Sequence, residues 1–437
     1  MPGVFSSIWQ AFAEKIPVIL PVLLKILQDW WWLPALVVFF YWFRYLYLYF
    51  IQERYFNKLK FILLEIKIPE EVLKPIKAME HVFAGFHSIH DVFIWRERWI
   101  EGQYLLSFSL EIVSIDGKVH FFIHVPEQFR HIIESNIYSQ YPEAEISQVE
   151  DYTKNIPQDI PNKDWDLFGT GFNASKPDPY PLKTYVKFES DVQPKEEKRV
   201  DPLAGLLEGM ATLKPGEQFW LQIIAKPIRE EKPWIKEGLE IRDKLARRPE
   251  KPKQKSILRE AAEVLATGST PGEVPEEEKE FLPPEMKLTS GEREIVQAIE
   301  EKISKFGFDC AVRYIYLGQR DVFFKPNARM PYGFFKEIST ENLSGLKPDT
   351  KKTMTKVKSI PFWFLDKRRV YLRKRKIFRY YQKRLTPFFP RPGGTFVLNT
   401  EELATLYHFP GRVVAPAPTV PRIEAKKSEP PSALPIE

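Results

Sequence analysis

The sequence predicts an α+β protein: an N-terminal transmembrane helix, then one or two ferredoxin-like α/β-sandwich units with a charged helical insertion. Three observations predict this class. An apolar run near the N-terminus is long enough to cross a membrane, hairpin and helix patterns follow it, and a highly charged stretch interrupts the second half. With 437 residues, 44% hydrophobic and 28% charged, the chain has a folded rather than a disordered composition.

The predicted membrane helix is residues 30–51, WWWLPALVVFFYWFRYLYLYFI. At ~1.5 Å per residue it reaches ~33 Å, enough for a ~30 Å hydrocarbon core. Arg44 costs ~2.5–3.5 kcal/mol at the bilayer centre, and less if the span is 26–43 and Arg44 lies at the interface. A buried helix of a soluble core is the alternative, which the lack of a polar stripe disfavours. The predicted anchor residues are Trp30, Trp31, Trp32, Phe39, Phe40, Trp42, Arg44 and Tyr45.

The charges that flank this run predict its orientation. Downstream, Arg54, Lys58 and Lys60 outnumber the acids, whereas the basic residues upstream are offset by acidic ones. The positive-inside rule therefore predicts a single-pass protein of the inner (cytoplasmic) membrane, with its N-terminus outside and its C-terminal bulk in the cytoplasm. Residues 1–29 are expected to be interfacial, although a helical hairpin remains open.

The first α+β domain is predicted to span residues 52–190. Its centre is a hairpin, with strands at 105–115 and 119–125 joined by an Asp-Gly turn. Helices are expected at 70–85 and 127–141, a strand at 144–149, and either a helix extension or a short strand at 57–66. A hairpin followed by a helix and a strand is half of a ferredoxin-like sandwich.

A second unit is predicted to begin at 191–228 and to continue at 287–411. The elements expected from the end of the first domain onward are a strand at 184–189, a helix at 202–213, a strand at 218–225, a helix at 292–306 and a strand at 308–317. Two sandwiches and one larger sheet both account for this order. Residues 229–286 are predicted to form a charged helical insertion with a mobile acidic loop, either a binding arm or a solvated excursion. The proline-rich tail is 412–437.

Residues 351–384 are the most biased segment, with fourteen Lys or Arg residues and a single acid. A helix is expected here, with Val370, Leu372, Ile377 and Tyr381 facing inward. Such a segment contacts nucleic acid or anionic lipid, although an acidic protein partner and a solvated face remain open. The candidate contact residues are Lys367, Arg368, Arg369, Arg373, Lys374, Arg375, Lys376, Arg379, Lys383 and Arg384.

Motifs for catalysis are absent from the sequence. It contains no phosphate-binding P-loop, no G-x-S-x-G elbow and no H-E-x-x-H motif. Cys310 is the single cysteine, which excludes an internal disulfide and a thiolate zinc cluster. We therefore expect a protein that is not an enzyme and that binds neither a metal nor a cofactor.

Several long strings resemble a known family. Among them are PEEVLKPIKAMEHVFAGFHSIH (69–90), KRVDPLAGLLEGMATLKPGEQFWLQI (198–223) and LNTEELATLYHFPG (398–411). The chain resembles an uncharacterised family of membrane-anchored proteins from Patescibacteria, candidate-phylum bacteria with reduced genomes. In that family, this region accompanies or is fused to a HerA-like P-loop ATPase of type IV secretion, the machinery of conjugative DNA transfer.

The resemblance implies a non-catalytic, oligomeric subunit of a DNA-translocation machine. Its ATPase would be encoded separately, because the chain ends soon after 398–411. A membrane-anchored scaffold for pilus or cell-envelope assembly, without nucleic acid, is the alternative. The helix at 398–411 either docks the ATPase or closes its own domain. Its candidate docking residues are Glu401, Glu402, Leu403, Leu406, Tyr407 and Phe409.

Overall fold

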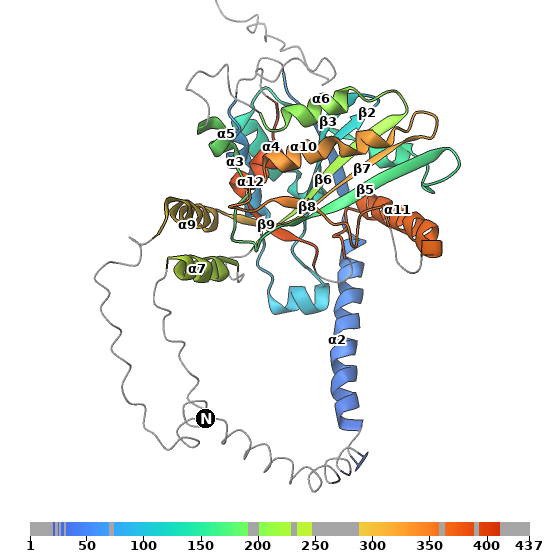
Figure 1. Ribbon diagram of the computed structural model, residues 1–437. Helices are drawn as coiled ribbons and strands as arrows, with labels where there is room; N and C mark the ends of the chain where they lie inside the picture. The colour runs from blue at the N-terminus through green and yellow to red at the C-terminus, as the bar shows by residue number, and fades with distance from the viewer. Residues whose placement is uncertain are drawn as a thin grey trace, which may run out of the picture. The chain divides into compact units, whose positions relative to one another are not determined.

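The computed structural model (Figure 1) divides the chain into two compact units. The first unit comprises Met1–Lys60 and Val92–Tyr104, and the second comprises Phe61–Asp91 and Leu105–Glu437. The structure describes residues 21, 25, 28–29, 32–69, 74–190, 201–228, 234–246, 288–357, 363–388 and 393–410.

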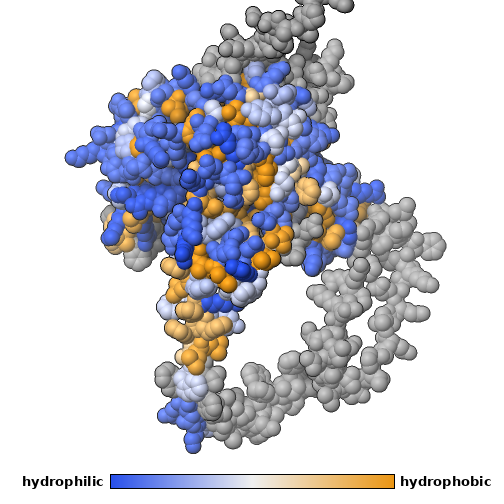
Figure 2. Space-filling view, turned by 180° about the vertical axis from the view of Figure 1, so that it is seen from behind, coloured by the Kyte–Doolittle hydropathy of each residue, from blue (hydrophilic) through white to orange (hydrophobic). Residues whose placement is uncertain are grey.

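The first unit contains the long helix α2, Trp32–Phe56, whose stretch Ala35–Phe56 has the length and composition of a candidate membrane span. Figure 2 shows that hydrophobic side chains gather along this helix. Trp32, Phe39, Phe40, Trp42 and Tyr45 are all exposed on it. Apolar side chains left outside the core over most of a helix are what a membrane span requires. The predicted anchor residues Trp30 and Trp31 lie outside the described residues.

The second unit begins with a complete ferredoxin-like motif. Its elements in chain order are β1 (Phe61–Lys67), α3 (Lys77–Phe86), β2 (Phe108–Ile115), β3 (Lys118–Pro126), α4 (Arg130–Gln140) and β4 (Glu145–Val149). The strand order β4-β1-β3-β2, with every pair antiparallel, is that of the β-α-β-β-α-β fold. Asp116 (φ 53°) and Gly117 (φ 82°) form the predicted tight turn between β2 and β3. The segment at 57–66, left open between helix and strand, supplies β1.

The second half repeats this order with larger interruptions. It contains β5 (Trp165–Ala174), α5 (Tyr185–Ser190), α6 (Ala204–Ala211), β6 (Glu217–Pro227), α7 (Trp234–Leu245), α9 (Ser290–Ile303), β7 (Gly307–Gln319), α10 (Met330–Glu337) and β8 (Leu346–Pro348). The order β8-β5-β7-β6 again matches the ferredoxin-like pattern. Helix α7 lies within the charged insertion predicted at 229–286, most of which is outside the described residues, and α9 is the helix predicted at 292–306.

The two motifs share one sheet. Strands β2 and β6 pair antiparallel from Phe108↔Ala225 to Ile115↔Gln218, which joins the motifs through equivalent edges. The continuous order in the described chain is β4-β1-β3-β2-β6-β7-β5-β8. Strand β9 (Phe396–Asn399) pairs with the end of β7 that β5 leaves free. Two sandwiches and one larger sheet, the alternatives left open by the sequence, are therefore both present.

Different helices cover the two faces of the sheet (Figure 1). The larger core lies under α3, α4, α6, α10 and α12 (Thr400–Leu406) and contains residues such as Phe83, Phe108 and Tyr314. On the opposite face, α11 (Asp366–Gln382) and the short helix η4 (Tyr152–Asn155) cover a smaller core around Trp220. The predicted basic helix is therefore the main helical cover of this second face.

Two local predictions are wrong. The strand expected at 184–189 is the helix α5, because Leu182 and Tyr185 donate backbone N–H bonds to the Glu402 and Thr405 side chains of α12. This tertiary contact overrides the β propensity of the segment. Leu372, expected to face inward from the basic helix, is 53% exposed, and Phe378 takes the core position instead.

Candidate functional site

A row of neighbouring residues crosses four strands on the face under α11. Glu111 on β2 pairs with Gln222 on β6, Gln222 pairs with Arg313 on β7, and Arg313 pairs with Gly171 on β5. Directly paired residues of adjacent strands point to the same face of a sheet. Three polar side chains and one glycine therefore lie side by side, and all three polar side chains are buried.

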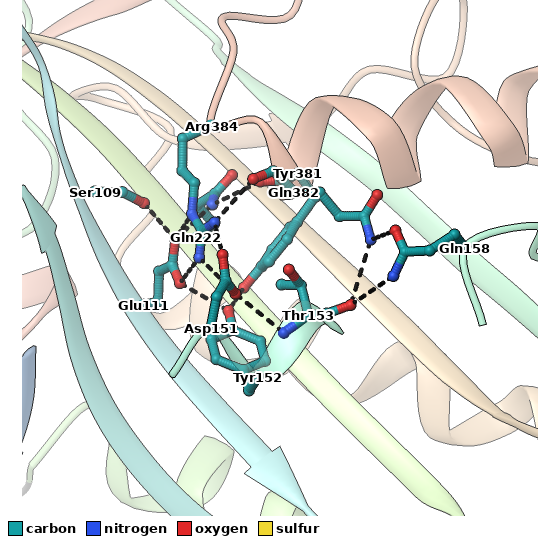
Figure 3. A network of polar contacts seen from close by, with 10 residues as sticks. All are labelled: Ser109, Glu111, Asp151, Tyr152, Thr153, Gln158, Gln222, Tyr381, Gln382 and Arg384. Atoms are coloured by element: carbon teal, nitrogen blue, oxygen red, sulfur yellow. Dashed lines mark hydrogen bonds and ion pairs between the residues drawn. The ribbon is translucent and has the colours of Figure 1, made fainter. Parts of the chain in front are cut away.

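At the Glu111 end of the row, two carboxylates compensate the positive charge of Arg384 (Figure 3). Arg384, which follows α11, donates from Nε to Glu111 Oε1 at 3.0 Å and also forms an ion pair with Asp151. The Tyr152 hydroxyl donates to Glu111 Oε2 at 2.7 Å and lies 2.8 Å from the Tyr381 hydroxyl. Burial alone would raise the pKa of Glu111, but the Arg384 guanidinium outweighs this and holds that pKa below its usual range.

Gln222 connects this cluster to Arg313. Its amide Nε2 donates to Glu111 Oε1 at 2.7 Å, and its Oε1 accepts a bond from Arg313 Nε at 2.6 Å. The Arg313 guanidinium also lies 6.0 Å from the centre of the Tyr381 ring. Arg313 is only 3% exposed, and its Nη2 has no hydrogen-bond partner among the described residues. Burial lowers the pKa of Arg313 to about 9, so the side chain is still charged at neutral pH.

Arg313 lines a pocket of about 320 Å³ between β5, α11 and the loop after β8. Gly171 carries no side chain into this space, so the neighbour of Arg313 in the row leaves the pocket open. Tyr380 and Phe388 contribute aromatic walls. No carboxylate lines the pocket within the described residues. Its five cationic residues are Arg313, Lys351, Lys352, Arg373 and Lys376.

The loop that carries Lys351 and Lys352 is held against β5 and α11. Gly171 N donates to Thr353 Oγ1 at 2.9 Å, and Asp349 N donates to Gly171 O at 2.8 Å. From α11, Arg373 donates to the carbonyl oxygens of Met354 at 3.0 Å and Lys351 at 2.5 Å. These bonds give the pocket a backbone frame, while the Lys351 and Lys352 side chains remain exposed.

A neighbouring hollow of about 420 Å³ shares Lys351, Lys352 and Phe388 with the pocket but differs in charge. Asp178 and Asp349 line it as well. The unbalanced positive charge is therefore concentrated on the α11 side, around Arg313. A cluster of cations beside aromatic rings, with no carboxylate among the described lining residues, is chemically suited to an anion that carries a planar group, such as a nucleotide.

The structure separates the ten predicted contact residues into different roles. Arg373 and Lys376 line the pocket, whereas Lys374 pairs with Asp166 at 2.5 Å and Arg375 donates to the Tyr371 hydroxyl at 2.9 Å. Arg369 is partly exposed. The remaining cations of the helix and its end are exposed: Lys367, Arg368, Arg379 and Lys383.

The structure contradicts the prediction for Arg384. This residue was predicted to contact nucleic acid or lipid, but its side chain is 8% exposed and is held by Glu111 and Asp151. Proximity in sequence grouped it with the basic helix. The chain takes a positive φ at Arg384 (50°), just past the end of α11, where the side chain reaches the buried carboxylates.

The structure also contradicts the prediction that the helix at 398–411 presents docking residues to a partner. Helix α12 begins with a capping box between Asn399 and Glu402, and Lys302 pairs with the buried Glu402 at 3.1 Å. Glu401 forms an ion pair with Lys305. Most side chains of this short helix are buried in the core of the second unit. The helix therefore closes its own domain rather than presenting a free surface. The buried docking candidates are Glu402, Leu403, Leu406, Tyr407 and Phe409.

Glu111, Gln222 and Arg313 were not predicted as site residues. Each is a polar residue within a mostly apolar strand, and this pattern could have indicated them. Pairing between strands distant in sequence brings the three together, and no single-strand pattern contains that information.

Comparison with known proteins identifies a family but no function. A family model described as Domain of unknown function (DUF8128) matches residues 64–328, more than half of the chain, and the chain belongs to this family. The match includes Glu111, Gln222 and Arg313 but ends before the loop at 351 and α11. No curated protein matches the chain.

Proposed function

We propose that this member of the DUF8128 family is a membrane-anchored, non-catalytic subunit that holds single-stranded nucleic acid for a translocation machine. A separately encoded P-loop ATPase would be its motor, as the resemblance to type IV secretion proteins implies. The observation that carries the proposal is the pocket in which buried Arg313 and four further cations face no described carboxylate.

The chemistry of the pocket favours a phosphate group. A guanidinium with a free Nη2 offers donors in a planar fork, and Arg373 and Lys376 add charge from the α11 side. Buried unpaired charge is costly, and a bound phosphate would offset that cost. Tyr380 and Phe388 supply rings on which a base of the same nucleotide stacks.

The exposed cations of α11 favour a polymer over a single small anion. They continue beyond the pocket along the helix and past its end, where successive phosphates of a strand would meet them. These residues are Lys367, Arg368, Arg379 and Lys383. A strand could therefore enter the pocket with one nucleotide while its neighbours lie along α11.

We infer from the candidate span that the protein is held at a membrane. The basic residues Arg54, Lys58 and Lys60 follow the apolar part of α2, and by the positive-inside rule they support a cytoplasmic second unit. A single pass through the inner membrane, with the N-terminus outside, and self-association around the ATPase complete the proposal.

The test is binding of a fluorescent single-stranded oligonucleotide to the full chain in nanodiscs, at salt concentrations from 50 to 200 mM. We expect affinity to fall steeply with salt, because phosphate contacts release counterions. The double variant Lys352→Glu, Lys376→Glu should bind at least ~10-fold more weakly, with a salt slope shallower by about 1.4 for two lost phosphate contacts.

Lys118→Glu with Lys214→Glu is the matched control, because both lysines are exposed and lie outside the pocket. This control makes the same change in net charge and should retain wild-type binding. Equal loss in both double variants would reduce the effect to net charge and overturn the proposed site. A wild-type chain that binds no oligonucleotide would instead favour the scaffold for pilus or envelope assembly.

A further inference from the structure

A short segment in the first unit exposes apolar side chains beside α2. It consists of residues 92–102 and contains the single π-helical turn η2 (Glu97–Glu101). Single exposed apolar residues are ordinary, but several within nine positions form a patch. The exposed side chains and their exposed fractions are Val92 60%, Ile94 61%, Trp95 70% and Ile100 57%.

Specific contacts hold this segment on α2. The Tyr47 hydroxyl donates to the Trp99 carbonyl oxygen at 3.0 Å, and the Arg44 guanidinium lies 5.6 Å from the centre of the Trp99 ring. Gly102 ends the turn at φ 74°, where a Cβ would lie 2.4 Å from the Ile51 carbonyl oxygen. Only glycine fits this approach, so the patch is built onto the helix rather than carried by a loose loop.

The residue types of the segment indicate a lipid headgroup region. Trp95 and Trp99 flank the exposed Arg96 and Arg98, and both residue types favour the boundary between hydrocarbon and water. The Glu97 carboxylate accepts a bond from Ile94 N at 2.9 Å, so it is engaged within the turn. The segment that carries the patch contacts the candidate span through Tyr47 and Arg44, which argues for a bilayer rather than a protein partner.

We propose that residues 92–102 insert into the headgroup region and set the depth at which α2 crosses the membrane. Arg44 then lies at the boundary between headgroups and hydrocarbon, where the Trp99 ring covers it. This removes the cost of a cation at the bilayer centre. The inference rests on α2 being a membrane span, which is part of the proposed function.

The test is site-directed spin labelling of the full chain in nanodiscs, with accessibility to oxygen and to a water-soluble nickel complex as the measure of depth. Labels go at Ile94→Cys, Ile100→Cys and Phe40→Cys, with Lys118→Cys as the aqueous reference. Native Cys310 is fully buried, and burial raises its thiol pKa, so it will not take the label. We expect position 40 to be deep and positions 94 and 100 to lie about 5–10 Å below the headgroup surface.

The outcomes separate this inference from the proposed function. If positions 94 and 100 match position 118 while position 40 is deep, α2 spans the membrane but the segment does not insert. If position 40 also matches position 118, the membrane anchor itself is refuted. Labels at 94 and 100 shielded from both reagents would indicate a protein contact and overturn the inference.

A second variant tests the close approach of Gly102 to Ile51. Gly102→Val should free the segment from Ile51, so positions 94 and 100 lose their shallow depth while position 40 stays deep. Unchanged depth at all three positions would show that Gly102 does not hold the segment, and would overturn its role in setting the depth of α2.

Discussion

Two buried arginines at opposite ends of one polar row have different surroundings. Arg384 is paired with two carboxylates and lies beside two tyrosine hydroxyls. Arg313, connected to the same network through Gln222, makes one side-chain hydrogen bond, has a buried Nη2 without a partner among the described residues, and lines a pocket with four further cations. The first cluster is complete within the chain, whereas the second has the composition of a site completed by an anion.

Under the proposed function, this difference divides stability and binding between two clusters on one face of the sheet. A buried charge without a partner costs free energy, so a fold without a further role would pair both arginines or replace one. Strained or uncompensated groups concentrate at functional sites. Four predictions test this division.

The largest effect is expected for Arg384→Met. Removing the guanidinium leaves Glu111 as a buried carboxylate without its cation, so the free energy of unfolding should fall by about 3–5 kcal/mol. Urea unfolding of the full chain in detergent, followed by tryptophan fluorescence, measures this. Adding Glu111→Gln should restore part of the loss. A loss below about 1 kcal/mol would mean that the cluster does not stabilise the fold.

A smaller effect is expected on acidification. Burial lowers the pKa of His124 to about 4, against an ordinary value of 6.5. Between these values the unfolded chain binds the extra proton, so stability is full above pH 6.5 and declines toward pH 4, by on the order of 2 kcal/mol. Unfolding measured from pH 7.5 to 4.5 tests this, and His124→Gln should flatten the curve. An equally steep curve in that variant would assign the decline to another group.

The cluster of Arg384, Glu111 and Asp151 makes the stability depend on pH in a separate, lower range. Arg384 outweighs burial and lowers the pKa values of Glu111 and Asp151, so the stability they contribute is present above their unfolded values near 4. That contribution is lost as the pH falls through the lower folded values. It therefore lies below the His124 window, and the two can be measured apart.

The smallest effect on stability is expected for Arg313→Met. It is the same substitution as in Arg384→Met, yet it removes an uncompensated charge, so stability should stay within about 1 kcal/mol of wild type. Oligonucleotide binding should fall at least ~10-fold, because the buried donor of the pocket is lost. If Arg313→Met destabilises the chain as much as Arg384→Met, the cationic pocket is structural and the comparison fails.

The first ferredoxin-like motif was easier to predict than the second. Its strands β2 and β3 are joined by the Asp116–Gly117 turn, a signal that needs only adjacent residues. Strand β5 carries glycines at 169 and 171, which weaken a strand pattern, and it was not predicted. Its glycines matter through partners far along the chain, since a Cβ at Gly169 would lie 3.1 Å from Ile377 of α11.

The sequence by itself determined which stretches are apolar, which are basic and which strands form the first hairpin. Composition and period suffice for these, because each depends on neighbouring residues. The tertiary structure decided that Arg384 is structural, that α12 is core and that Arg313 faces a pocket. The outcomes for the two arginines depend on which distant strand supplies the neighbour: Glu111 for Arg384 and Gly171 for Arg313. Strand pairing brings together residues more than a hundred positions apart, so cations that look alike in sequence acquire opposite roles.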